Sequence, residues 1–280
     1  KFLKTLKTIS EYGAWKQTVS GKIGFIPTMG ALHEGHISLI KKSINEADYT
    51  VVSIFVNNAQ FSPVEDFSKY PRPLEKDSSI LESLNVDVLF LPSKSIMYPE
   101  GFSTFVQENM LARGLESLSR PHFFKGVLTV VLKLFNIIQP DMAYFGEKDI
   151  QQLQLVQKMV KDFNLKVQVI PGKSVREPNG LAMSSRNNYL NDTDRKSLGI
   201  IYGSLVSAKK SIINGEKNSS TIKRKIKSDL NNFSGLRIDY VEISKKETLE
   251  TISTIEGNVI ISIAVFVGEV RLIDNISISI

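Results

Sequence analysis

Segments of strand length and segments of helix length alternate along the first 170 residues of the chain. The predicted strands lie at residues 22–27, 50–56, 87–92, 141–146 and 166–171. The predicted helices that follow the first four of them lie at residues 35–47, 72–84, 126–138 and 148–163. Because a strand, a crossover helix and a second strand form a right-handed unit with parallel strands, this order predicts a parallel sheet covered by helices.

A different pattern begins after residue 175. Two helical segments are followed by three strand-like segments with short connections, at residues 195–214, 219–233, 238–244, 258–267 and 270–280. Short connections favour antiparallel pairing, since parallel neighbours need a long crossover. We therefore expect an α/β fold with two parts: a Rossmann-like parallel-sheet domain at residues 1–175 and a smaller α+β domain with antiparallel strands at residues 176–280.

The composition excludes several classes of protein. Hydrophobic residues make up 42% and charged residues 23% of the 280 residues, which is typical of a globular protein. The absence of cysteine rules out disulfides, thiolate zinc sites and a cysteine nucleophile. Residues 1–16 predict an amphipathic helix and not a signal peptide. The apolar runs at residues 127–138 and 259–267 are shorter than the roughly 18 residues of a membrane span. We expect a soluble, cytoplasmic protein with no membrane partner.

The chain carries a small excess of positive charge. Its net charge is +6, from 35 basic and 29 acidic residues. A lysine-rich solvated surface explains this value, and attraction of an anionic nucleotide or nucleic acid is the alternative. Basic residues are scattered apart from Lys209–Lys210 and residues 223–227, so they form no continuous stripe. We expect no nucleic-acid partner.

Four polar clusters directly follow predicted strands. They are PTMGALHEGH at residues 27–36, NNAQF at residues 57–61, FGEKD at residues 145–149 and PGKSVRE at residues 171–177. In an open parallel sheet, ligands bind beyond the carboxyl ends of the strands. The four clusters are therefore expected to converge on one rim of the sheet.

The first cluster places two of the three histidines, His33 and His36, beside Gly35 at a predicted helix start. A helix start presents N–H groups and the positive end of a dipole, which suits a phosphate. Gly30 and Gly35 would let a ligand approach the backbone closely. Two alternatives stay open: an ordinary turn histidine, or a metal site. Zinc needs at least three nitrogen or sulfur ligands, and besides carboxylates only His122 is left.

Two further segments suit an anionic ligand. Lys148 at a helix start could pair with an anion, or with a neighbouring carboxylate as surface lysines do. Asp149 could cap the helix or hold a ribose hydroxyl. MSSR at residues 183–186 combines two hydroxyls with a guanidinium, which could clamp a phosphate. Taken alone, MSSR is an ordinary polar turn.

Gln60 and Gln152 carry amides near predicted strand ends. These amides could bind hydroxyl or carboxylate groups, or could lie at the surface. The chain has no Gly-x-x-x-x-Gly-Lys-Ser/Thr sequence and no Gly-x-Gly-x-x-Gly sequence. This argues against a P-loop and against the common dinucleotide-binding fingerprint.

The clusters together resemble a known family. HEGH is similar to the signature of HIGH-motif nucleotidyltransferases, and MSSR stands where their relatives carry a second phosphate loop. The ordered set that matches more closely is PTMGALHEGH, SIFVN..QF, YPR.LEKD, MYP, KLFNIIQPDMAYFGEKDIQQL, MVKDFNL, VRE..GLAMSSRN.YL and VRLIDNI. In this order, over nearly the whole chain, these motifs resemble the pantoate–β-alanine ligases.

The resemblance implies a reaction in two steps. The pantoate carboxylate attacks the α-phosphorus of ATP and gives pantoyl-adenylate and pyrophosphate. The amine of β-alanine then attacks the acyl carbon and releases AMP, so the product is pantothenate. Magnesium accompanies ATP, bound chiefly by phosphates and water. The resemblance also implies a homodimer, and a C-terminal lid domain that shields the adenylate from water.

The resemblance assigns roles to residues of this chain. His36 is the better candidate for a proton donor to the phosphates. The residues expected to act in catalysis are His33, His36, Lys148 and Arg186. Those expected to hold pantoate are Gln60, Gln152, Asn57 and Met29. Those expected to bind ATP are Met29, Gly30, His33, His36, Gly146, Glu147, Lys148, Asp149, Val175, Met183, Ser184, Ser185 and Arg186.

The chain departs from the family pattern at three places. Asn58 replaces a proline in VNPxQF, and Pro73 stands where threonine is common. In SRPHFFKGV, at residues 119–127, His122 falls on a glycine of the pattern and Phe123 on a histidine. A site histidine is therefore expected to be missing, or to be supplied by His122 from a shifted backbone. A non-glycine residue at 122 also raises the question of a positive φ in this turn.

Three other functions compete with this one. The first is a related adenylyltransferase or ligase that uses the same nucleotide site for another acid, although Gln60 and Gln152 favour pantoate. The second is a non-enzymatic module that binds nucleotide or RNA, suggested by the basic balance. The third is an inactive synthetase, suggested by the departure at Phe123.

Overall fold

The computed structural model describes residues 2–62 and 67–280. The chain forms two compact units. The first unit comprises Lys1–Asn109, Arg120–Glu147 and Gln152–Lys173. The second unit comprises Met110–Ser119, Lys148–Gln151 and Ser174–Ile280, so two short segments from earlier in the chain belong to it.

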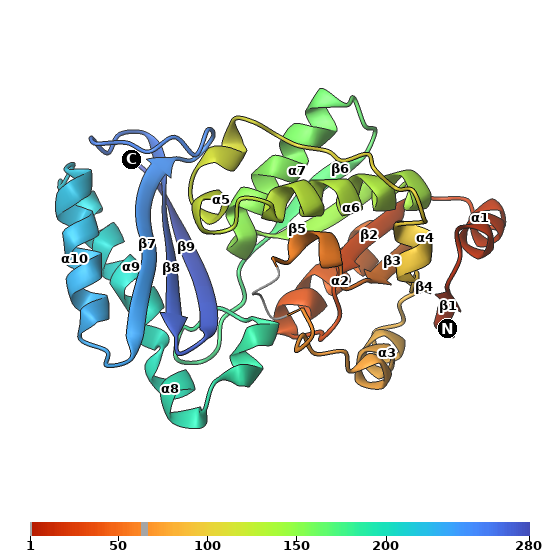
Figure 1. Ribbon diagram of the computed structural model, residues 1–280, viewed down its shortest axis with the longest axis horizontal. Helices are drawn as coiled ribbons and strands as arrows, with labels where there is room; N and C mark the ends of the chain where they lie inside the picture. Colours follow the sequence, from red (N-terminus) through yellow and green to blue (C-terminus); the bar gives the residue numbers. More distant parts are fainter. Residues whose placement is uncertain (1, 63–66) are drawn as a thin grey trace. The chain divides into compact units, whose positions relative to one another are not determined.

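A six-stranded parallel sheet forms the centre of the first unit (Figure 1), with the strand order β1-β4-β3-β2-β5-β6. The strands are β1 (Lys4–Leu6), β2 (Ile23–Thr28), β3 (Tyr49–Ile54), β4 (Val88–Phe90), β5 (Met142–Gly146) and β6 (Gln168–Gly172). Strand β2 lies between β3 and β5. Since the strands are parallel, the segments that follow β2, β3 and β5 leave the same edge of the sheet. The predicted parallel α/β sheet is confirmed.

Helices connect these strands. They are α1 (Ile9–Gln17), α2 (Glu34–Glu46), η1 (Asn58–Gln60), α3 (Leu74–Ser83), α4 (Lys94–Met97), α6 (Phe123–Ile138) and α7 (Ile150–Asp162). Apolar side chains of α2 and α3, such as Ile40 and Leu81, pack with Ile26 and Leu89 of the strands in one core cluster. Helix α6 buries most of its side chains, as its apolar sequence predicts. No helix in the described parts of the chain is long and apolar enough to cross a membrane.

The predicted helix at residues 1–16 is wrong in its first half; residue 1 itself lies outside the described residues. Residues Lys4–Leu6 form strand β1, which pairs in parallel with β4. The helix begins only at Ile9, where Thr8 accepts a hydrogen bond from the Glu11 N–H and Glu11 accepts one from the Thr8 N–H. This capping box fixes the helix start, and pairing with a distant strand overrides the local apolar spacing before it.

The second unit contains a three-stranded antiparallel sheet, β7-β8-β9, as predicted. Its elements are η2 (Leu111–Arg113), α5 (Glu116–Ser119), η4 (Ser185–Tyr189), α8 (Asp192–Ser197), α9 (Gly199–Ile213), α10 (Ser219–Asn231), β7 (Leu236–Lys245), β8 (Asn258–Val267) and β9 (Val270–Ser279). Figure 1 shows α9 and α10 on one side of this sheet. Leu205 and Ile226 of these helices share a buried cluster with Ile261 and Val265 of β8. The predicted helix at residues 195–214 is divided at Leu198.

Candidate active site

The turn between β2 and α2 is held by a buried carboxylate from α3. Asp77 is 1% exposed, and its two oxygens accept the backbone N–H groups of Ala31 and Leu32, each at 2.8 Å. Burial raises the pKa of Asp77, while these two hydrogen bonds act in the opposite direction. The backbone is left-handed at Gly30 (φ 80°) and Ala31 (φ 52°). Asp77 therefore stabilises a left-handed backbone conformation, which a non-glycine residue such as Ala31 rarely adopts.

The two histidines of this turn form the cap of helix α2. The Nδ1 atom of His33 accepts the Gly35 N–H at 3.1 Å, and the Nδ1 atom of His36 accepts the His33 N–H at 3.4 Å. The two ring centroids are 4.1 Å apart. Because both Nδ1 atoms accept, a neutral ring carries its proton on Nε2, which is then a donor. Both histidines therefore take part in the turn, as one alternative predicted, and Nε2 is the donor atom of each ring at the positive end of the helix.

Two amides and a thioether meet beyond β2 and β3. The Nδ2 atom of Asn57 donates to Oε1 of Gln60 at 3.0 Å and to the Gly126 carbonyl at 3.1 Å. The Nε2 atom of Gln60 lies 3.2 Å from Sδ of Met29. Asn57 is 1% exposed and Gln60 is 8% exposed. The structure thus brings together Met29, Asn57 and Gln60, while Gln152 lies half-buried in α7.

Gly126 brings helix α6 against the segment that carries Gln60. A Cβ atom at Gly126 would lie 2.3 Å from the Ala59 carbonyl oxygen and 2.6 Å from the Gln60 nitrogen. We expect Gly126→Ala to lower the free energy of unfolding by about 1–3 kcal/mol, because backbone atoms must move apart. Gly13→Ala in α1 is the matched control, since nothing lies within 4 Å of its added Cβ. That control should gain up to about 1 kcal/mol from helix propensity. Urea unfolding measures both variants, and equal stabilities would contradict the close approach.

The departure at residues 122–123 is accommodated without strain. His122 precedes α6 with φ −98°, so this turn needs no glycine. The guanidinium of Arg120 lies 3.6 Å from the centroid of the Phe123 ring, and its Nη2 atom is 3.4 Å from the Gln60 carbonyl oxygen. Phe123 therefore supports an arginine that contacts the Gln60 segment.

The residues around the end of β5 divide between the two units. Gly146 ends β5 in the first unit, and an added Cβ there would meet nothing within 4 Å. Glu147 closes the same segment of the first unit and opens the short helix η3 (Glu147–Asp149). Lys148 and Asp149 belong to the second unit, where Nζ of Lys148 lies 3.8 Å from Oδ2 of Asp149. The predicted alternative, a pair with a neighbouring carboxylate, is therefore present; Asp149 is 46% exposed, so the pair is weak. Asn275 donates to the Lys148 carbonyl at 2.8 Å and fixes its backbone.

Hydrogen bonds hold the predicted phosphate loop, residues 183–186, in the second unit. The Met183 N–H donates to the Val175 carbonyl at 2.9 Å. Ser184 accepts the Arg186 N–H and thereby caps the short helix η4, and Ser185 is buried. Next to Val175 in the chain, Arg176 makes two hydrogen bonds to Asp274, at 2.6 and 2.9 Å. The motifs VRE and LIDN are thus partners in space.

Sequence reasoning missed the residues that hold these loops in place. They include Asp77, Tyr98, Asp274 and Asn275. Each lies inside a motif that supported the family resemblance. For Asp274 and Asn275 the available signal was a pair of polar residues within a largely apolar segment, which predicts buried partners without saying which ones. The polar sequence around Asp77 and the short motif around Tyr98 gave no such signal.

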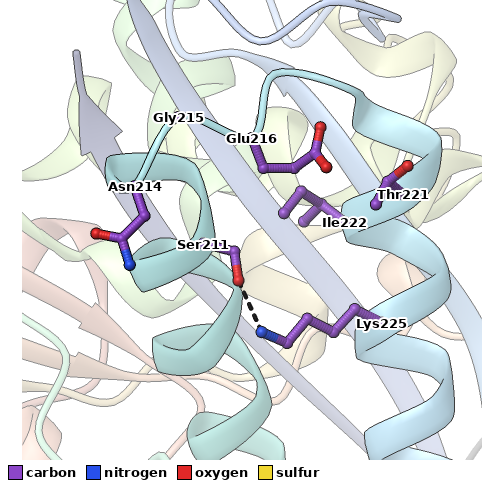
Figure 2. Close-up of a pocket in the computed structure, with 7 residues that line it drawn as sticks. All are labelled: Ser211, Asn214, Gly215, Glu216, Thr221, Ile222 and Lys225. Carbon is purple, nitrogen blue, oxygen red and sulfur yellow. Dashed lines mark hydrogen bonds between the residues drawn. The ribbon is translucent and has the colours of Figure 1, made fainter.

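A shallow pocket in the second unit lies apart from these residues in the sequence. Figure 2 shows its lining between α9 and α10, where Nζ of Lys225 donates to Oγ of Ser211 at 2.7 Å. Its residues are Ser211, Asn214, Gly215, Glu216, Thr221, Ile222 and Lys225. It contains none of the predicted site residues, so it is not the candidate active site.

Comparisons with known proteins identify the family. A family model described as pantoate-beta-alanine ligase matches residues 1–277. The pantothenate synthetase of Thermosipho africanus is 54% identical over 253 residues, which cover 90% of this chain and 91% of that protein. The crystal structure of pantothenate synthetase from Thermus thermophilus matches with a TM-score of 0.93 and 41% identity, over 98% of both chains. The structure of the Francisella tularensis pantoate-beta-alanine ligase, complexed with beta-gamma ATP and beta-alanine, matches with a TM-score of 0.80 and 39% identity, over 98% of this chain and 97% of that one. The chain therefore belongs to the pantoate–β-alanine ligases, a family of enzymes of pantothenate biosynthesis.

Proposed function

We propose that this chain joins pantoate to β-alanine with ATP, through a pantoyl-adenylate intermediate, and releases AMP and pyrophosphate. One observation carries the proposal within the family. The ends of the adjacent strands β2 and β3 bring a histidine-capped helix start to the same sheet edge as the buried pair Asn57 and Gln60. The Francisella relative that was complexed with beta-gamma ATP and beta-alanine supports both of these ligands.

The first step needs no nucleophile from the protein. A carboxylate oxygen of pantoate forms a bond to the α-phosphorus of ATP, and the bond from that phosphorus to the bridging oxygen breaks. Pyrophosphate leaves with the electron pair. The protein contributes by positioning the reactants and stabilising charge on the phosphates. In this proposal His33 and His36 donate from Nε2 to phosphate oxygens. Further cations and hydroxyls come from Lys148, Ser184, Ser185 and Arg186.

In the second step the amine nitrogen of β-alanine forms a bond to the acyl carbon. The bond from that carbon to the phosphate oxygen breaks, AMP leaves with the electron pair, and the amine releases a proton to solvent. Gln60 and Gln152 hold the pantoyl group, beside Asn57 and Met29. Asp149 binds the ribose of ATP. The remaining ATP contacts are proposed at Gly30, Gly146, Glu147, Val175 and Met183.

The side chains proposed to contact the ATP phosphates are compatible with a magnesium ion that binds together with ATP. Among residues 2–62 and 67–280, no three His, Asp or Glu side chains are grouped as a metal site. The proposed phosphate contacts are imidazole, ammonium, guanidinium and hydroxyl groups, whereas magnesium prefers carboxylate, phosphate and water oxygens. This donor set leaves the phosphates and water as the ligands of the ion. When bound, magnesium neutralises charge on the triphosphate.

Pyrophosphate–ATP exchange tests the proposal on the intact protein. We expect exchange with magnesium and D-pantoate in the absence of β-alanine, because adenylate formation is reversible. Omitting pantoate should abolish it. ATP binding without pantoate-dependent exchange would contradict the proposal, and a screen of other small acids would then identify the substrate. The homodimer implied by the family resemblance is tested separately by sedimentation velocity.

A further inference from the structure

The hydroxyl of Tyr98 contacts the amide pair of the proposed pantoate site. Tyr98 directly follows α4, and its hydroxyl oxygen lies 2.7 Å from Oδ1 of Asn57. Its ring packs against Phe55 and Phe102, with centroid separations of 6.1 and 5.1 Å. The phenol is therefore presented by a rigid aromatic group, and no catalytic step described above uses it.

Two backbone groups determine which way the Asn57 amide faces. The Ala59 N–H can only donate, so the Asn57 atom facing it, at 3.3 Å, is the oxygen Oδ1. The Gly126 carbonyl can only accept, so the atom facing it, at 3.1 Å, is the nitrogen Nδ2. The reversed amide would place donor against donor and acceptor against acceptor.

The orientation of Asn57 in turn determines that of Gln60. The Nδ2 atom of Asn57 is only a donor, so it faces Oε1 of Gln60, at 3.0 Å. The N–H edge of Gln60 then lies on the opposite side, beside Sδ of Met29 at 3.2 Å. A thioether is a weak acceptor, so an oxygen of a hydroxy acid would be a better partner for this edge. Gln60 thus presents donors to a ligand.

Tyr98 completes this chain of hydrogen bonds. Because Oδ1 of Asn57 accepts only, the Tyr98 hydroxyl must donate. Burial raises the pKa of Tyr98 to about 12, so the hydroxyl keeps its proton near neutral pH. We propose that Tyr98 is a positioning residue for the hydroxy-acid site: through Asn57 it holds the N–H edge of Gln60 toward the substrate oxygens. The inference rests on the proposed function, since it assigns pantoate as the acceptor.

The substitution Tyr98→Phe removes one hydroxyl and keeps the ring. We expect KM for D-pantoate in the exchange reaction to rise roughly 3- to 10-fold, the factor for one hydrogen bond, with KM for ATP unchanged. Tyr12→Phe is the matched control, because the buried Tyr12 hydroxyl donates to the Ile138 carbonyl at 3.0 Å in the same unit. A purely structural role for Tyr98 would make the two variants alike in both constants, and that outcome would overturn the proposal.

A second measurement is independent of the substrate. In protein labelled with ¹⁵N-glutamine, the side-chain amide signal of Gln60 is identified as the one lost in Gln60→Glu. We expect this signal to shift or broaden in Tyr98→Phe and to stay unchanged in Tyr12→Phe. If the parent enzyme shows no pantoate-dependent exchange, the proposed function fails, yet the amide signal still decides whether Tyr98 orders Gln60. An unchanged Gln60 signal in Tyr98→Phe would overturn the positioning role in either case.

Discussion

Replacing His36 by alanine should slow pantoate-dependent pyrophosphate exchange by about 10²- to 10³-fold, the usual effect of removing one preorganised donor to a charged transition state. The imidazole accepts the His33 N–H through Nδ1, so its Nε2–H is oriented before any ligand arrives. The stability effect should be small, because the Nδ1 contact at 3.4 Å is a long hydrogen bond. Exchange rates and thermal unfolding, measured on the same preparation, separate the two effects.

Helix α1 supplies the matched control for His36. Glu11 occupies the same helical position as His36, and its carboxylate accepts the N–H of the capping residue Thr8 at 3.0 Å. Glu11→Ala therefore removes the same kind of contact away from the proposed site. We expect Glu11→Ala to keep the parent exchange rate. If His36→Ala lost exchange activity only in proportion to its loss of folded protein, His36 would act as a helix cap and not in catalysis.

The periodicity of the chain predicts most of the fold because most elements bury a continuous apolar face. Strand β3 is an example, since TVVSI is apolar enough to be buried on both sides of a parallel sheet. The helix predicted for the first residues is wrong for a reason that no local sequence pattern contains. Lys4–Leu6 pair with β4, more than 80 residues away, and that pairing supplies the hydrogen bonds that a first helical turn would otherwise make.

The same limit explains what could be predicted of the candidate site. The segments that carry His36 and Gln60 could be placed at one sheet edge, because strand ends follow from periodicity. The residues that hold them, Asp77 in α3 and Tyr98 directly after α4, lie about 40 positions further along the chain. Spacing along the sequence does not encode such pairs. Their hydrogen bonds become visible only when the folded backbone is known.

A buried ion-pair network in the second unit supports the second large prediction. The guanidinium of Arg271 donates to both oxygens of Glu116, at 2.6 and 2.9 Å, and to Asp239 at 2.7 Å. The side chains of Arg271, Glu116 and Asp239 are 15%, 8% and 17% exposed. Burial disfavours the charged guanidinium, but the hydrogen bonds and negative charges of Glu116 and Asp239 together outweigh it and raise the pKa of Arg271 above its ordinary value. The network thereby fastens α5 to β7 and β9.

We expect Arg271→Met to lower the free energy of unfolding by about 3–5 kcal/mol, because it leaves the buried Glu116 carboxylate and the partly buried Asp239 carboxylate without their counter-ion. Lys245→Met is the matched control in β7. It breaks the Lys245–Glu250 pair, whose side chains are 52% and 64% exposed, and such exposed pairs contribute about 0–1 kcal/mol. Chemical unfolding curves of both variants give the comparison. A loss below about 1 kcal/mol for Arg271→Met would mean that water solvates the network despite its burial.

A double variant separates two effects of losing Arg271: the loss of its attraction to the carboxylates, and the cost of leaving those carboxylates without a counter-ion. In Glu116→Gln combined with Arg271→Met, one of the two uncompensated carboxylates is gone, while the Tyr240 hydroxyl can still donate to the amide oxygen at position 116. The double variant should therefore be more stable than the sum of the two single losses predicts, with a coupling of about 0.5–3 kcal/mol. Additive losses would show that the carboxylates tolerate the absence of Arg271.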